Sequence, residues 1–163
     1  GLDGLAGKTS VAYTVFFASV ISVIIYRFGV AGEVREEYFN LLVFCMALIG
    51  ALCGFLLFNS YPAAVFMGDT GALALGGALA GLAVMSKLSL IAPIIGIMYV
   101  VSCVSDIIQV LHFKRTRHRV FLMAPFHHHL ERKGMHENKI VSLYTLITFF
   151  VGAVTLVIIL ALN

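Results

Sequence analysis

The chain has 163 residues, of which 61% are hydrophobic and 12% are charged, and its formal net charge is +3. A water-soluble globular domain carries about 25% charged residues, and this composition folded in water would leave large apolar patches exposed. It therefore excludes an ordinary soluble domain. Because the apolar residues fall in long runs, it predicts an all-α, polytopic bundle of transmembrane helices in a lipid bilayer.

Five apolar segments are candidates to cross a bilayer, whose hydrocarbon core needs about 20 helical residues. They run over about 10–30, 38–58, 70–85, 88–113 and 140–162. The third segment is short, and its Gly77 and Gly81 have the G-x-x-x-G spacing that lets helices approach closely, so we expect this helix to be buried among its neighbours. Pro93 is expected either in the first turns of the fourth helix or at a bend in it.

Lysine and arginine are divided unequally between the two sides that five crossings would create. One side receives the loops at about 1–9, 59–69 and 114–139, which carry eight Lys and Arg, whereas the other side carries three. The first side is therefore expected to be cytoplasmic and the C-terminus to lie outside. The basic cluster indicates membrane topology, and no nucleic-acid partner is expected.

The segment Phe66–Gly71 places Asp69 at the mouth of the third, small-residue helix. A carboxylate in this position is suited to bind Mg²⁺ and, through it, phosphate oxygens. Gly68 permits close approach of the backbone to a ligand. The alternative is that Asp69 is the N-cap of the helix.

Three consecutive histidines, His127, His128 and His129, follow Pro125. Three successive side chains cannot all face one way on a helix or a strand, and they lack the spaced ligands of zinc sites. Imidazoles can instead donate hydrogen bonds to phosphate or transfer protons near neutral pH. The alternative is a solvated polar loop.

Two further groups have both a functional and a structural interpretation. The basic run Lys114–Arg119 can anchor the chain to anionic headgroups and can also attract an anionic substrate. Asp106 and Gln109 are three residues apart on one face of the fourth segment, where an ionisable group suggests a functional site. A buried, partnered or protonated Asp106 is the alternative, and Gln109, nearer the cytoplasmic end, is the better substrate contact.

Four motifs occur in the same order in the phospho-N-acetylmuramoyl-pentapeptide transferase (MraY) family, which this chain resembles over its whole length. They are Gly1-Leu2-Asp3-Gly4-Leu5-Ala6, Asn59-x-x-Pro62-Ala63, Val65-Phe66-Met67-Gly68-Asp69-x-Gly71, and Met123-Ala124-Pro125-x-His127-His128-His129-x-Glu131-x-x-Gly134. The resemblance implies a bacterial inner-membrane enzyme of the polyprenyl-phosphate sugar-1-phosphate transferase superfamily, with ten transmembrane helices, a homodimeric state and a need for Mg²⁺. The Pro-x-His-His-His motif favours this family over relatives that transfer N-acetylglucosamine phosphate.

The resemblance also implies roles for particular residues. Asp69 resembles the Mg²⁺-binding aspartate, and the expected catalytic set is Asp69, His127, His128 and His129. The expected uridine and ribose contacts are Asp3, Asn59, Phe66 and Gly68, whereas Gln109 and His128 resemble residues near the sugar-peptide part of the substrate. Asp106 matches none of the family motifs.

The implied reaction transfers phospho-MurNAc-pentapeptide from UDP-MurNAc-pentapeptide to undecaprenyl phosphate, giving lipid I and UMP on the cytoplasmic side. Because the family chain is about twice as long, residues 1–163 are expected to be the C-terminal half of a single transferase domain. The N-terminal half of the same protein is then a required partner. The alternatives are a sibling polyprenyl-phosphate N-acetylglucosamine-1-phosphate transferase and, more remotely, a transporter that uses Asp106.

Overall fold

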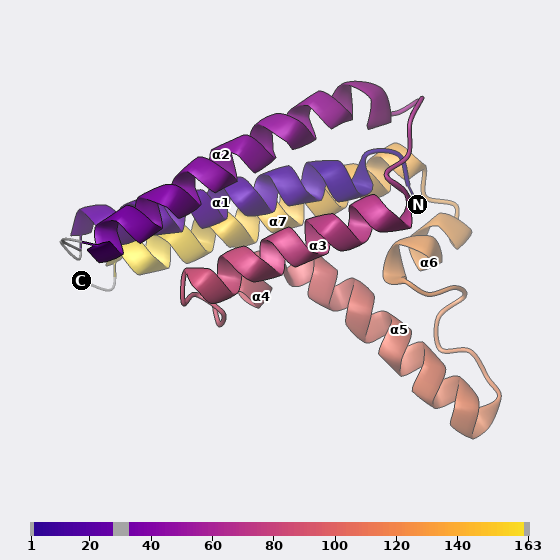
Figure 1. Ribbon diagram of the computed structural model, residues 1–163. Helices are drawn as coiled ribbons and strands as arrows, with labels where there is room; N and C mark the ends of the chain where they lie inside the picture. Colours follow the sequence, from indigo (N-terminus) through magenta and orange to yellow (C-terminus); the bar gives the residue numbers. More distant parts are fainter. Residues whose placement is uncertain (1, 28–32, 162–163) are drawn as a thin grey trace.

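The computed structural model describes residues 2–27 and 33–161 (Figure 1). Gly1 of the first motif, residues 28–30 of the first predicted span and residue 162 of the last lie outside these residues. The described residues form helices and no strands, and the helices are α1 (Leu5–Arg27), α2 (Glu33–Asn59), α3 (Gly68–Met85), α4 (Ala92–Ile95), α5 (Ile97–Thr116), α6 (Phe126–Arg132) and α7 (Glu137–Ala161).

Five of these helices are long and apolar enough to span a membrane, namely α1, Arg35–Asn59 of α2, α3, α5 and α7. Successive spans run in alternating directions, so that the described chain begins at one end of the bundle and finishes at the other (Figure 1). The chain is therefore an all-α, multi-pass membrane protein, as its composition predicts.

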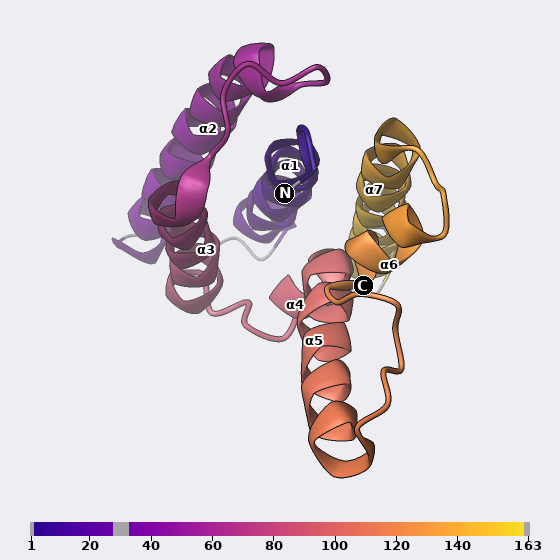
Figure 2. The ribbon, with the colours of Figure 1, turned by 90° about the vertical axis from the view of Figure 1, so that its right-hand side faces the viewer.

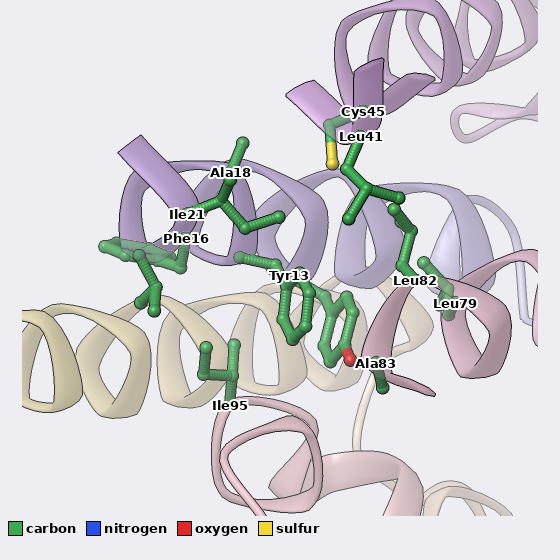
Figure 3. Packing of buried hydrophobic residues seen from close by; sticks show 12 residues of the cluster. Tyr13, Phe16, Ala18, Ile21, Leu41, Cys45, Leu79, Leu82, Ala83 and Ile95 are labelled. Atoms are coloured by element: carbon green, nitrogen blue, oxygen red, sulfur yellow. The ribbon is translucent and has the colours of Figure 1, made fainter. Parts of the chain in front are cut away.

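Helix α1 is the centre of the bundle and packs along α2 on one side and α7 on the other. Its Phe17, Val20 and Ile21 have no exposed surface. Figure 3 shows how the same cluster receives Leu41 from α2 and Ile95 from α4. Side chains of α2 and α4 thus meet those of α1.

Polar side chains inside α1 are satisfied locally. The hydroxyl groups of Thr9 and Thr14 donate to the carbonyl oxygens one turn earlier, each at 2.7 Å. Ser10 instead shares a 2.6 Å hydrogen bond with the Tyr99 hydroxyl of α5. These bonds matter because an unpaired polar group is costly where water is excluded.

The fourth predicted span is wrong as a continuous helix over 88–113. Residues 89–91 form turns, α4 begins at Ala92 with Pro93 in its first turn, and Gly96 (φ −84°, ψ 29°) separates α4 from α5. Proline supplies no backbone N–H, so it fits the first turn and not the interior of a helix. Because of this break α5 points away from α1, α2 and α7 (Figure 2).

Helix α3 has the predicted position but not the predicted burial within the described residues. Only Leu79, Leu82 and Ala83 are buried, and a Cβ added at Gly77 or Gly81 would meet nothing within 4 Å. Helix α3 contacts the α1 cluster through Leu79, Leu82 and Ala83. Its other glycine and alanine residues offer little side-chain area for such contacts. The small-residue face is left open by the helices described.

The helix termini also differ from the predicted loops. Helix α1 begins at Leu5, inside the predicted loop 1–9, and α5 continues to Thr116, where Arg117 adopts a left-handed conformation (φ 60°). The short helix α6 lies within the predicted loop 114–139 and contains the three histidines.

The contact between α1 and α7 generates a stability prediction. A Cβ placed on Gly152 would lie 2.5 Å from the Phe16 ring, whereas one placed on Gly50 of α2 would meet nothing within 4 Å. Gly50→Ala should be neutral or stabilising, because alanine favours helix by about 1 kcal/mol. Gly152→Ala should destabilise the protein by about 1–3 kcal/mol through overpacking.

Melting temperatures of the two variants of the whole detergent-solubilised protein would check this difference. An equal effect of the two substitutions would contradict the close approach of α1 and α7.

Candidate functional site

The polar segments singled out from the sequence gather at one end of the bundle. The start of α1, the connection from α2 to α3, the start of α3, helix α6 and the start of α7 all lie there, as Figure 1 shows at its right-hand side. Figure 2 views the molecule from this end. Segments separated by more than 100 residues therefore form one candidate site.

Asp3 connects three of these segments. One carboxylate oxygen, Oδ2, accepts a 2.8 Å hydrogen bond from the backbone N–H of Ala63. The backbone N–H of Asp3 donates to the Glu137 carboxylate at the start of α7. Sequence analysis assigned Asp3 only to ligand contact and missed this structural role. Asp3 and Glu137 are 134 positions apart, so no local sequence pattern predicts their hydrogen bond.

Asn59, the last residue of α2, shapes the connection to α3. Its side chain is only 6% exposed, and its amide donates to the carbonyl oxygen of Val65 at 2.8 Å. The carbonyl oxygen of Phe58 also accepts hydrogen bonds from Ala64 and Val65. The loop is thereby folded back on the end of α2, and the next side chain, Phe66, is left 60% exposed.

Asp69 is the second residue of α3 and is exposed. The N-cap is Met67, and it forms no side-chain capping bond, so the alternative of an Asp69 N-cap is wrong. A carboxylate in the first turn is still favoured by the helix dipole. Gly68 has φ +63°, a conformation that glycine adopts without strain.

The donor set constrains how a metal ion could bind. The described residues contain no group of three His, Cys, Asp or Glu side chains that could hold a metal by themselves. Mg²⁺ does not need such a cage, because it commonly binds one or two carboxylates, several waters and substrate phosphates. The exposed carboxylate of Asp69 fits this shared mode of binding.

Gln109 fastens the segment after α5 to the helix. Its side-chain oxygen accepts hydrogen bonds from Val120 at 3.2 Å and Phe121 at 2.9 Å, and its amide nitrogen donates to the carbonyl oxygen of Phe121 at 3.1 Å. The amide of Gln109 is thus engaged at both of its polar atoms. The structure gives Gln109 a positioning role that the sequence did not indicate.

Helix α6 is held against α5 by a relay through Ser105. The Ser105 hydroxyl accepts from the backbone N–H of Phe126 at 3.0 Å and donates to the Ser102 carbonyl oxygen at 2.6 Å. His129 Nδ1 accepts from the backbone N–H of Leu122 at 3.1 Å. The His129 ring is also within 5.8 Å of the Phe126 ring. His129 therefore supports the fold of this segment.

The three histidines do not all face one way, as three successive positions on a helix predict, but the centroids of the His127 and His128 rings are only 4.4 Å apart. His128 Nδ1 lies 2.9 Å from a carboxylate oxygen of Glu131. Because an ionised carboxylate only accepts, Nδ1 carries the proton and Nε2 of a neutral ring can accept from a ligand. The His127 ring instead lies 6.0 Å from that of Tyr144.

The surroundings of His127 disfavour its protonated form. Its Nδ1 is buried and has no hydrogen-bond partner among the described residues. Burial, followed by the proximity of His128, lowers the pKa of His127 from 6.5 to about 4. His127 is therefore neutral at pH 7 and can accept a proton or a hydrogen bond but carries no charge.

The profile of the glycosyl transferase family 4 matches residues 1–87, which include Asp3, Asn59, Phe66, Gly68 and Asp69. This match covers more than half of the chain, and the chain belongs to this family.

Individual relatives extend the similarity through the histidine segment. Proteins named phospho-N-acetylmuramoyl-pentapeptide-transferase are 46% identical in Clostridium acetobutylicum and 49% identical in Clostridium perfringens strain 13, each over 148 residues and 91% of this chain. The protein of that name in Granulibacter bethesdensis is 47% identical over 161 residues and 93% of this chain. The chain spans 43% of the length of each of these three relatives.

The hydrogen bonds by which Gln109 holds Val120 and Phe121, called here the Gln109 clamp, can be tested by amide hydrogen exchange. Gln109→Leu should speed the exchange of the Val120 and Phe121 amides, because both lose their acceptor, at a cost of about 1 kcal/mol per hydrogen bond. Gln109→Glu keeps an acceptor at the same position and is the matched control. Unchanged exchange in Gln109→Leu would show that the clamp does not hold this segment.

The lowered pKa of His127 predicts a pH dependence of stability. Between the ordinary value of 6.5 and the folded value of about 4, the unfolded chain binds more protons at this ring than the folded chain. The stability associated with neutral His127 is therefore fully present above pH 6.5 and decreases as the pH falls towards 4. His127→Gln should lose less stability over this interval, and melting temperatures at about pH 7 and about pH 4.5 would measure it.

Equal losses in the parent protein and in His127→Gln would contradict this assignment, as would a His127 ring that titrates near 6.5 by NMR.

Proposed function

We propose that this chain is the C-terminal half of a Mg²⁺-dependent enzyme that transfers phospho-MurNAc-pentapeptide from UDP-MurNAc-pentapeptide to undecaprenyl phosphate. The products are lipid I and UMP. The observation that carries the proposal is the 46–49% identity over 91% of the chain to proteins named phospho-N-acetylmuramoyl-pentapeptide-transferase. The arrangement of the candidate residues at one end of a membrane bundle agrees with a reaction between a soluble and a lipid substrate.

The proposed reaction is a displacement at phosphorus. An oxygen of the lipid phosphate attacks the β-phosphorus of the UDP-sugar, a new P–O bond forms, and the bond to UMP breaks as UMP leaves with the bonding electrons. Such reactions depend mainly on positioning and on stabilising developing negative charge. Asp69 would hold Mg²⁺, which supplies positive charge for the pyrophosphate oxygens.

The uridine end of the substrate would meet the connection between α2 and α3. The exposed ring of Phe66 offers a flat face on which a base can stack, and one such stack contributes about 1–3 kcal/mol. Gly68, without a side chain, leaves the backbone open to the ligand. Asn59 and Asp3 would act by holding this connection in place as well as by polar contact with the nucleoside.

The histidines would act on the phosphate and sugar. His128, oriented by Glu131, presents Nε2, which donates to a phosphate oxygen when the ring is protonated and accepts from a hydroxyl when it is neutral. His127 remains neutral at pH 7 because of its lowered pKa of about 4. His129 would keep the segment Leu122–His129 folded. Gln109 would contribute to the sugar-peptide side through the loop that it clamps.

The setting of the enzyme follows from the same proposal. It would be a homodimer in the bacterial inner membrane, with the site facing the cytoplasm, since the polar end carries eight Lys and Arg against three on the other side. The N-terminal half of the protein would complete the site. Products and topology together would place it in peptidoglycan synthesis.

Two other functions lead to different results. A sibling transferase would prefer UDP-N-acetylglucosamine, which a competition assay separates. A transporter that uses Asp106 would be inactivated by Asp106→Asn and would tolerate changes at Asp69 and His128.

The assay uses the whole protein in nanodiscs with undecaprenyl phosphate, Mg²⁺ and UDP-MurNAc-pentapeptide, and it follows UMP release. Asp69→Asn should reduce the rate by about 100-fold or more, because metal binding supplies several kcal/mol of transition-state stabilisation. Asp106→Asn is the comparison variant and should be less severe. Absence of UMP release, or equal rates in parent and folded Asp69→Asn protein, would refute the proposed function or the placement of the metal.

A further inference from the structure

A pocket of about 560 Å³ lies between α5 and the segment that returns from it to α6. Figure 2 shows these elements at the lower part of the molecule. Three cations line it, and each comes from a different element: Lys114 from the last turn of α5, Arg119 from the returning segment and Arg132 from the end of α6. Local sequence does not bring these three residues together, because Arg119 and Arg132 are 13 positions apart and lie on different elements.

The positive charge of this cationic pocket is not neutralised from within the described part of the chain. Lys114, Arg119 and Arg132 take part in no ion pair among the described residues, where the single contact between a carboxylate and a basic side chain is that of Glu131 with His128. The one acid in the lining is Asp106. It lies eight residues before Lys114, about 12 Å along the helix, so the lining has three cations against one carboxylate and keeps an excess of positive charge.

The rest of the lining is apolar, with Val110 and Phe113 on α5 and Met123 on the returning segment. An inorganic anion or a bare phosphate gains nothing from such a wall. A ligand that combines apolar groups with a terminal carboxylate is complementary to both parts, because arginine binds carboxylates through paired N–H donors. A peptide with a free C-terminus has this combination. The lipid phosphate of the proposed reaction has it too, but its phosphate must react beside the metal held by Asp69, which does not line this pocket.

The cationic pocket is continuous with the candidate site. Gln109 belongs to its lining and clamps the returning segment, and Arg132 ends the helix that carries the three histidines. A ligand held at the histidines could therefore extend into the pocket.

We propose that the cationic pocket formed by Lys114, Arg119 and Arg132 binds the C-terminal carboxylate of the peptide carried by the substrate. The assignment rests on the proposed function, which supplies a peptide-bearing sugar nucleotide. It adds a site that recognises the peptide, separate from the metal and nucleoside contacts near Asp69.

The test compares two substrates of the whole protein in nanodiscs, UDP-MurNAc-pentapeptide and its C-terminal carboxamide. The parent enzyme should show kcat/KM about tenfold lower for the carboxamide, through KM, because a charge-assisted hydrogen bond is lost. Arg119→Gln and Arg132→Gln should each lower kcat/KM for the acid about tenfold and leave the carboxamide nearly unchanged. Arg132→Lys should restore part of the preference for the acid.

Lys133→Gln is the matched control, because Lys133 is the exposed residue next to Arg132 and does not line the pocket. It should keep the full preference for the acid. Melting temperatures identify any variant that fails to fold, and Arg132→Lys and Arg119→Gln provide independent measurements if Arg132→Gln is one of them.

Each remaining outcome overturns the assignment in a recognisable way. Equal use of acid and carboxamide by the parent enzyme, or equal loss of both substrates in the arginine variants, excludes recognition of the carboxylate. Activation by phosphatidylglycerol that disappears in the arginine variants, with the acid preference unchanged, assigns the pocket to a lipid headgroup instead. No UMP release by the parent from either substrate refutes the proposed function itself and the assignment with it.

Discussion

The packing of α1 between α2 and α7 is the constraint on which the arrangement of the polar end depends. At Gly152 the helix α7 approaches the Phe16 ring so closely that a Cβ would overlap it. Dispersion and close packing, more than any directional bond, hold apolar helices together in a membrane. Because α1 and α7 are fixed along their length, their first residues lie side by side, and Asp3 can reach Glu137 across 134 positions of sequence.

A set of polar side chains then converts the end of this bundle into a shaped site. Asp3 holds the connection between α2 and α3, Gln109 holds the segment after α5, and Ser105 holds the start of α6. Each of them accepts hydrogen bonds from backbone N–H groups that would otherwise be unpaired in irregular segments. Phe66 and Asp69, by contrast, are exposed, and their side chains are available to a ligand.

Several predictions came from local pattern and were confirmed, whereas the predicted burial of α3 failed because it depended on distant residues. Hydrophobic runs identify the membrane helices because bilayer thickness sets their length, and helix geometry alone predicts that the three histidines do not all face one way. The break between α4 and α5 was only half predicted, since Pro93 permits both a first-turn position and a bend. The open space beside Gly77 and Gly81 among the described residues was missed, because a small-residue motif shows that a helix can be approached closely and not which helix lies next to it.

The sequence by itself determined that this is an all-α membrane protein and which motifs carry its family resemblance, since both properties reside in composition and in the order of short segments. It also named Asp3 and Gln109, but it could not give their structural roles. Tertiary structure alone decided that Asp3 joins three segments, that His127 is buried beside Tyr144, and that Lys114, Arg119 and Arg132 converge on one pocket. The burial, the pKa and the local net charge of a side chain depend on which groups lie next to it, and helix packing determines which groups these are.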